Sequence, residues 1–192
     1  MRLLLLISTY LIVGGSNSAA YCLPELPDET FFNAVVEVRG HTISGIMVIK
    51  KDEQIKNTCR ILFTTVAGPK LMDMYITKDD YNILYVTKKL KKRTILGLFQ
   101  KDFALVSGLY LAVQDKHCEN GSCSVKLPKK KSAHYSFDAQ NRISRAEYRG
   151  RGKVLLDVVY TYNQDNIESI FLQHYNFKMK ITLNAINSTC QN

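Results

Sequence analysis

Five cysteines are the residues of this sequence best suited to a defined chemistry: Cys22, Cys59, Cys118, Cys123 and Cys190. Cys118 and Cys123 flank Asn120-Gly121, a residue pair that strongly favours a tight turn. We therefore expect a local disulfide between them. A metal site is less favoured, because the spacing is not CxxC and no second Cys/His pair matches it. The pairing of the other three cysteines stays open, and the odd total leaves one thiol over.

The remaining chemically capable side chains form no catalytic pattern. The four histidines lie in separate segments, at His41, His117, His134 and His174. No HExxH, GxSxG or glycine-rich phosphate-binding motif occurs in the sequence. Asp79-Asp80 is most simply a turn pair, and Asp102 part of a helix face. We therefore expect a protein that is not an enzyme and has no metal or cofactor, with an uncharacterised hydrolase as the third interpretation.

A basic run between two apolar segments indicates a charged surface. Five of its six consecutive positions are cationic: Lys88, Lys89, Lys91, Lys92 and Arg93. A second basic group surrounds Pro128, at Lys126 and Lys129 to Lys131. Each Lys or Arg near an anionic membrane is worth about 1 kcal/mol. The run is either a solvated turn or a surface that docks to anionic headgroups or an acidic partner.

The N-terminus has the pattern of a secretory signal peptide. Arg2 is followed by an apolar run from Leu3 to Val13 and then by the small residues Ser18-Ala19-Ala20. We predict cleavage after Ala20, which leaves one domain, residues 21–192, with a net charge of +8 against +9 for the whole chain. An exported protein is an unlikely partner for nucleic acid, so anionic lipid, glycan or an acidic protein is favoured. A lipid anchor on Cys22 is kept as an alternative.

Period-two alternation of apolar and polar residues predicts a mostly β domain of about ten antiparallel strands. In the clearest case, residues 176–184, Phe177, Met179, Ile181 and Leu183 share one face, and Lys178 and Lys180 lie on the other. Other predicted strands are 34–39, 43–50, 59–66, 70–77, 81–87, 134–137, 143–148, 153–162 and 167–175. Short helices are predicted at 24–32 and 94–107. So large a sheet with so few helices must curl to bury its apolar face.

This order of elements resembles the LolA/LolB-like lipoprotein carriers of the bacterial envelope. The resemblance rests on "VEVRGHTISGIMVIKK", "RILFTTVAGPKLMDMYIT", "YNILYVTKKLKKRTILGLFQKDF" and the C-terminal meander. It implies a strongly curved, unclosed half-barrel with an apolar concave face and a periplasmic or outer-envelope location. The sequence departs from these proteins in lacking Trp and in its extra cysteines.

The leading functional hypothesis is a monomeric protein that holds or carries a lipid or lipoprotein acyl chain without catalysis. Flexible methionine side chains suit a cavity that accepts varied apolar cargo. The predicted cavity residues are Met72, Met74, Ile76, Phe177, Met179, Ile181 and Leu183. The alternative is a protein-interaction module with a filled core and a basic binding face.

Overall fold

The computed structural model describes residues 29–52, 55, 57–113 and 115–186, and these form one antiparallel sheet with a helical connection. The first five strands are β1 (Glu29–Val38), β2 (His41–Lys51), β3 (Cys59–Thr64), β4 (Lys70–Ile76) and β5 (Tyr81–Val86). The helices α1 (Arg93–Val106) and η1 (Leu109–Ala112) follow. The remaining strands are β6 (Lys116–Glu119), β7 (Ser122–Leu127), β8 (Lys131–Phe137), β9 (Ile143–Gly150), β10 (Lys153–Asn163), β11 (Asn166–His174) and β12 (Met179–Ala185).

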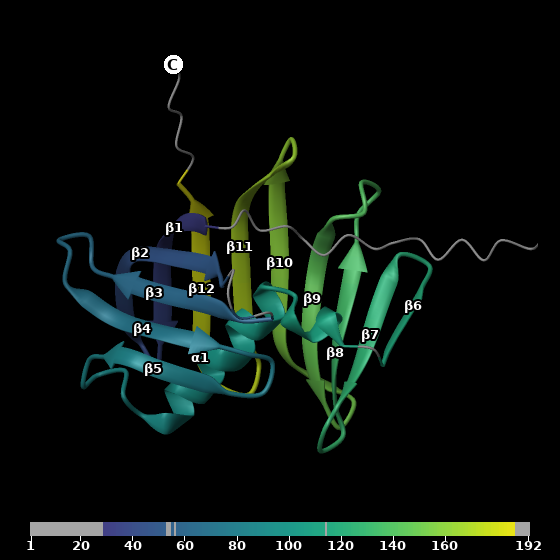
Figure 1. Cartoon of the computed structure of the whole chain (residues 1–192), viewed down its shortest axis with the longest axis horizontal. Coiled ribbons are helices and arrows are strands. Elements are labelled where there is room, and N and C mark those ends of the chain that lie inside the picture. The colour runs from purple at the N-terminus through teal and green to yellow at the C-terminus, as the bar shows by residue number, and fades with distance from the viewer. Residues whose placement is uncertain (1–28, 53–54, 56, 114, 187–192) are drawn as a thin grey trace, which may run out of the picture.

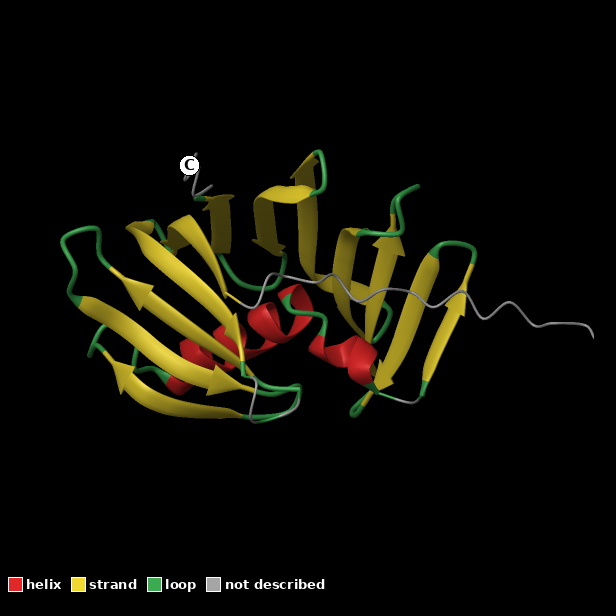
Figure 2. Ribbon diagram, turned by 45° about the horizontal axis from the view of Figure 1, so that its top comes forward, coloured by secondary structure: helices red, strands yellow, loops and turns green. Residues whose placement is uncertain are grey.

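The course of the chain explains where the helices lie. The strand order is β5-β4-β3-β2-β1-β12-β11-β10-β9-β8-β7-β6, so the chain starts in the middle of the sheet and reaches one edge at β5. It then crosses to the opposite edge at β6 through α1 and η1, and returns strand by strand until β12 pairs with β1. The strands curl around the two helices, which occupy the concave side (Figures 1 and 2).

Tight turns between neighbouring strands follow from the local sequence. Asn120 and Gly121 both have positive φ, at 49° and 71°, as a two-residue hairpin turn requires. Arg151 and Gly152 turn in the same way, at 50° and 79°. These turns join strands whose side chains alternate between the core and solvent, and the result is a meander.

The fold class predicted from the sequence is confirmed: the described residues form a curved, unclosed antiparallel sheet of 12 strands with an apolar concave face. The helix predicted at 94–107 is observed at Arg93–Val106. The short helix predicted at 24–32 is wrong over its second half, because Glu29 to Phe32 belong to β1 and pair with β2. Residues 24–28 of that prediction, the signal peptide, Cys22 and Cys190 lie outside the described residues.

No helix in the described part of the chain is both long enough and apolar enough to cross a membrane.

Candidate functional site

A continuous apolar surface runs across four neighbouring strands on the concave side of the sheet. Strand pairing places Phe32 opposite Met47, Met47 opposite Phe63, and Phe63 opposite Met72. The next row joins Ile49, Ile61 and Met74 in the same way. All of these side chains are buried in one core cluster, together with Leu96, Phe99 and Phe103 of α1. The surface thus combines stiff aromatic and β-branched residues with three methionines, which repack at low cost.

The structure places the predicted cavity residues at two positions in this core. Met72, Met74 and Ile76 lie on β4 and are fully buried. Met179, Ile181 and Leu183 lie on β12, which β1, β2 and β3 separate from β4, and are at most 1% exposed. Lys178 and Lys180 are exposed.

Phe177 has a different setting, because it precedes β12 and is only partly buried. Its ring lies 4.9 Å from the guanidinium carbon of Arg39, a cation–π contact. The sequence pattern grouped Phe177 with the strand residues. In the structure it lies at the border of the core, where its ring contacts the guanidinium group of Arg39.

Tyrosine hydroxyls hold the C-terminal end of α1. Tyr160 donates a hydrogen bond to the Val106 carbonyl at 3.0 Å, and Tyr135 donates one to the Leu105 carbonyl at 3.3 Å. Carbonyls in the last turn of a helix have no partner within the helix. The Tyr160 bond satisfies the Val106 carbonyl, and the Tyr135 bond adds to the one that the Leu105 carbonyl accepts from the Gly108 amide at 3.1 Å. Burial also raises the pKa of both tyrosines, which keeps them protonated as donors.

A buried acid–imidazole pair joins the same half of α1 to the sheet. The Asp102 carboxylate lies 3.0–3.1 Å from Nε2 of His174 on β11, and these two side chains are 0% and 3% exposed. Burial raises the pKa of Asp102, and the neighbouring imidazole opposes that rise. Sequence reasoning missed the pair, because its members are 72 positions apart and neither belongs to a motif.

The N-terminal half of α1 is held less completely. Gln100 donates from its amide nitrogen to the Thr77 and Lys78 carbonyls, at 2.9 and 3.0 Å. Before Gln100, only Leu96 and Phe99 are buried, whereas every residue from Asp102 to Val106 is. The helix therefore ends as a buried core element but begins as a surface helix, with one face on the methionine-containing strands.

The predicted basic run forms the connection from β5 to α1. Lys88, Lys89, Lys91, Lys92 and Arg93 are all exposed, while Leu90 between them is buried and fixes the loop to the core. No acidic residue lies in the first turn of α1, and no side chain caps it. Cations near a helix N-terminus are unfavourable for the helix itself, so this arrangement concentrates positive potential in one exposed place.

In the folded chain, the second basic group includes cations from segments that are distant in sequence. Lys129 and Lys130 occupy the β7–β8 turn with positive φ, 59° and 58°, a conformation that usually favours Gly or Asn. The Arg151 amide donates to the Lys130 carbonyl at 3.0 Å, so the basic β9–β10 turn lies alongside. Burial and the positive charge of Lys131 lower the pKa of Lys101 on α1, which brings a third element into this group.

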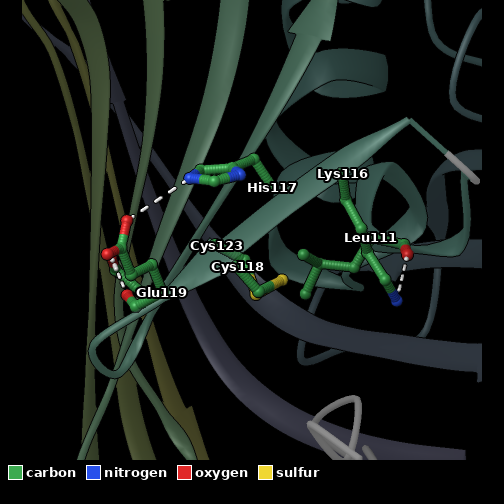
Figure 3. Close-up of a disulfide and its surroundings, with 7 residues drawn as sticks. Leu111, Lys116, His117, Cys118, Glu119 and Cys123 are labelled. Carbon is green, nitrogen blue, oxygen red and sulfur yellow. Dashed lines mark hydrogen bonds and ion pairs between the residues drawn. A yellow bond between two sulfur atoms is a disulfide. The ribbon is translucent and has the colours of Figure 1, made fainter. Parts of the chain in front are cut away.

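The predicted disulfide is confirmed (Figure 3). Cys118 and Cys123 are bonded and lie opposite each other on β6 and β7. Lys116 donates to the Leu111 carbonyl of η1 at 3.3 Å, so the same short strand is also tied to the helical connection. Cys59 is buried and carries no disulfide within the described residues, and burial raises the pKa of its thiol.

Polar residues on the outer surface of β6 to β9 line a depression of about 370 Å³, away from the core. Its lining includes His117, Glu119, His134, Glu147 and Arg149. These groups engage one another: His117 lies 3.5 Å from Glu119, and Nε of Arg149 lies 2.8 Å from Glu147. Each pair joins residues two positions apart on one strand, β6 or β9, so these are neighbouring side chains on the same face of the sheet.

Comparisons with known proteins find similarity of structure alone. No protein family model and no curated protein matches the sequence. A solved domain from Vibrio parahaemolyticus, named for outer membrane lipoprotein sorting, is 10% identical, with 85% of this chain and 86% of that chain covered and a TM-score of 0.47. A DUF1329 family protein from Desulfovibrio piger is 6% identical, with coverages of 88% and 89% and a TM-score of 0.42. Both similarities concern the fold, and neither identifies a ligand of this chain.

Proposed function

We propose that this is an exported, non-catalytic protein of the cell envelope that holds the acyl chain of a lipid or lipoprotein. The binding region is the apolar surface of β2, β3 and β4 beneath the N-terminal half of α1. The observation that carries the proposal is the contrast within α1. Its C-terminal half is held by buried polar contacts, whereas before Gln100 only Leu96 and Phe99 are buried, in the same core cluster as Met47, Met72 and Met74.

An acyl chain would enter by displacing Leu96 and Phe99 from the methionine surface. Each buried methylene of the ligand contributes about 0.8 kcal/mol, so eight or more methylenes would compensate for two displaced side chains. Methionines rearrange at low cost because their side chains are unbranched. The buried contacts at Tyr135, Tyr160 and His174 would keep the helix attached during this change.

Photo-crosslinking with a diazirine fatty acid tests this location. The purified chain is labelled and digested, and the modified residues are mapped by mass spectrometry. We expect modification on β2 to β4 and around Leu96 and Phe99. The outer surface of β9 and β10 is the internal control, because its side chains face away from the core. Equal labelling of both surfaces would show nonspecific contact and contradict the proposal.

The five cations from Lys88 to Arg93 are proposed as the docking surface for anionic membranes. Changing Lys91, Lys92 and Arg93 to Gln removes three charges at roughly 1 kcal/mol each, so vesicle binding should weaken by about a hundredfold. The matched control changes three exposed lysines elsewhere: Lys50, Lys178 and Lys180.

Vesicles of neutral and of anionic lipid are compared at low and moderate salt, because exposed charges are screened over about 8 Å at physiological ionic strength. Equal losses in the loop variant and the control would mean that net charge alone, and not this loop, governs binding.

The second candidate is a protein-interaction module with a filled core. It is supported by the complete burial of Met72, Met74 and Ile76, because a core filled by the protein's own side chains would bury these residues in this way. In that case the fatty acid would not be taken up at any concentration, and the basic surface would bind an acidic protein. Saturable uptake of a fluorescent fatty acid decides between the two candidates.

A further inference from the structure

The two edges of the sheet differ in how far they are protected from pairing with another strand. β6 has four residues, carries Lys116 and Glu119, and is tied to β7 by the disulfide. Short, charged edge strands of this kind resist association. β5 has six residues, none of them charged, and is hydrogen-bonded to β4 on one side as the terminal strand of the sheet.

Three of the four exposed side chains of β5 are large and apolar, and the fourth belongs to Asn82. Ile83, Leu84 and Tyr85 are 37%, 50% and 46% exposed, so three consecutive large apolar residues lie on an open edge. Leu84 has no opposite residue on β4, because Ile83 pairs with Met74 and Tyr85 with Asp73. This bulge frees Leu84 for a contact beyond the edge. An uncharged edge strand with exposed apolar side chains is suited to pairing with a further strand.

The charges that flank β5 indicate what that further strand is. Asp79 and Asp80 immediately precede the strand, Lys88 and Lys89 follow it closely, and all four side chains are exposed. Asp79 forms an ion pair with Lys78, its sequence neighbour. An antiparallel partner with the same sequence would place its basic end beside the acidic end of this strand, and its acidic end beside the basic end.

We propose that two copies of this chain associate through antiparallel pairing of their β5 strands. A two-fold axis at Leu84 brings Asp79 and Asp80, just before β5, close to Lys88 and Lys89, just after β5 of the second copy, and symmetry repeats this contact at the other end. The two Leu84 side chains meet at the axis. Such an interface is isologous and closes at two copies. The proposal does not rest on the acyl-chain site, but it takes Lys88 and Lys89 into the contact between copies and leaves Lys91, Lys92 and Arg93 for the membrane. It replaces the monomer expected from the sequence.

Charge exchange gives the decisive experiment, with self-association measured by sedimentation velocity over a range of micromolar concentrations. Asp79→Lys with Asp80→Lys places like charges at both ends of the pair, and so does Lys88→Asp with Lys89→Asp. Opposite charges at the two ends of the pair favour association, and like charges oppose it. Each double variant should therefore weaken the dimer by roughly tenfold or more.

The variant that carries all four substitutions restores opposite charges across the axis, so it should dimerise again. Leu84→Lys should abolish association in every background. Circular dichroism and thermal unfolding establish that each variant is folded. The proposal is overturned if the parent chain stays monomeric at about 100 µM. It is also overturned if the variant with all four substitutions associates no better than the double variants. Unchanged self-association of the Leu84→Lys variant also overturns the proposal. If that variant instead loses binding to vesicles or to an unrelated peptide, the β5 edge contacts lipid or another protein.

Discussion

Replacing His174 by Leu would test the buried contact between α1 and the sheet. The change keeps an apolar side chain of similar size but leaves the fully buried Asp102 carboxylate without its imidazole partner. Breaking a buried charged pair by removing one partner costs about 3–5 kcal/mol. The total stability of a domain is about 5–15 kcal/mol. The corresponding loss of melting temperature is roughly 6–20 °C for a chain of this size.

The loss should also depend on pH in a defined direction. Burial raises the pKa of Asp102, and His174 opposes that rise, so removing the imidazole raises the carboxyl pKa further. A carboxyl group with a raised pKa binds its proton more tightly in the folded chain than in the unfolded chain. Stability therefore falls as pH rises from about 4 toward the raised value. We expect the deficit of the His174→Leu variant to be larger at pH 8 than at pH 5.

Urea unfolding followed by circular dichroism at both pH values measures these differences. The matched control is the double variant with Leu at both 102 and 174, which removes the pair without leaving an unpaired carboxylate. It should lie within about 1 kcal/mol of the parent protein, because well-packed apolar replacements of buried pairs are often neutral. A single variant that loses less than about 1 kcal/mol at pH 8, or a double variant as unstable as the single one, would refute the reasoning.

Three further predictions concern contacts around the core. Tyr160→Phe should lower the free energy of unfolding by about 1–3 kcal/mol, because it removes the hydroxyl that donates to the buried Val106 carbonyl, whereas Tyr135→Phe should cost only about 1 kcal/mol, because the Leu105 carbonyl keeps the Gly108 amide; an unchanged urea midpoint for Tyr160→Phe would contradict this. Changing Cys118 and Cys123 to Ser should cost about 2 kcal/mol for so short a loop, and a melting temperature insensitive to both substitution and reductant would count against it. Asp73 has its pKa lowered by a guanidinium hydrogen bond, so its stabilisation is present above about pH 4 and is lost as pH falls through the lowered value; the stability difference from Asp73→Asn should shrink in acid, and a constant difference would be inconsistent with it.

Local sequence patterns predicted most of the fold for a simple physical reason. Alternation with period two appears wherever one face of a strand is buried, and Met179 to Ala185 shows it with Lys180 outward and Ile181 inward. Turn pairs such as Asn120-Gly121 carry their own conformational preference. These signals are contained within a few neighbouring residues, so one sequence is enough to read them.

The elements that were missed have weak or conflicting local signals. β6 is four residues long and mostly exposed, so its alternation is not visible, and only the cysteine spacing pointed to the hairpin. Glu29 to Phe32 were predicted to be helical after Pro24, but pairing with β2 makes them a strand. Tertiary contact decides such segments, and local preference does not.

The candidate site was predictable only in part. Met72 and Met74 could be chosen because they alternate with Leu71, Asp73 and Tyr75 on one strand. Their neighbours across the sheet, Met47 and Phe63, depend on strand register, which one sequence does not fix. The contact between Asp102 and His174 depends on how α1 crosses the sheet, and no local pattern encodes that crossing.

Native mass spectrometry of the chain, purified without detergent from a host that exports it, tests the central claim most directly. The lipid-holding account predicts a second charge-state series, heavier by the mass of one lipid or acyl group, that disappears on denaturation. The same preparation, once emptied, should take up a fluorescent fatty acid with saturation near one molecule per chain. A single series at the mass of the bare polypeptide, together with no saturable uptake, would contradict the account and favour a protein whose concave core serves only its own folding.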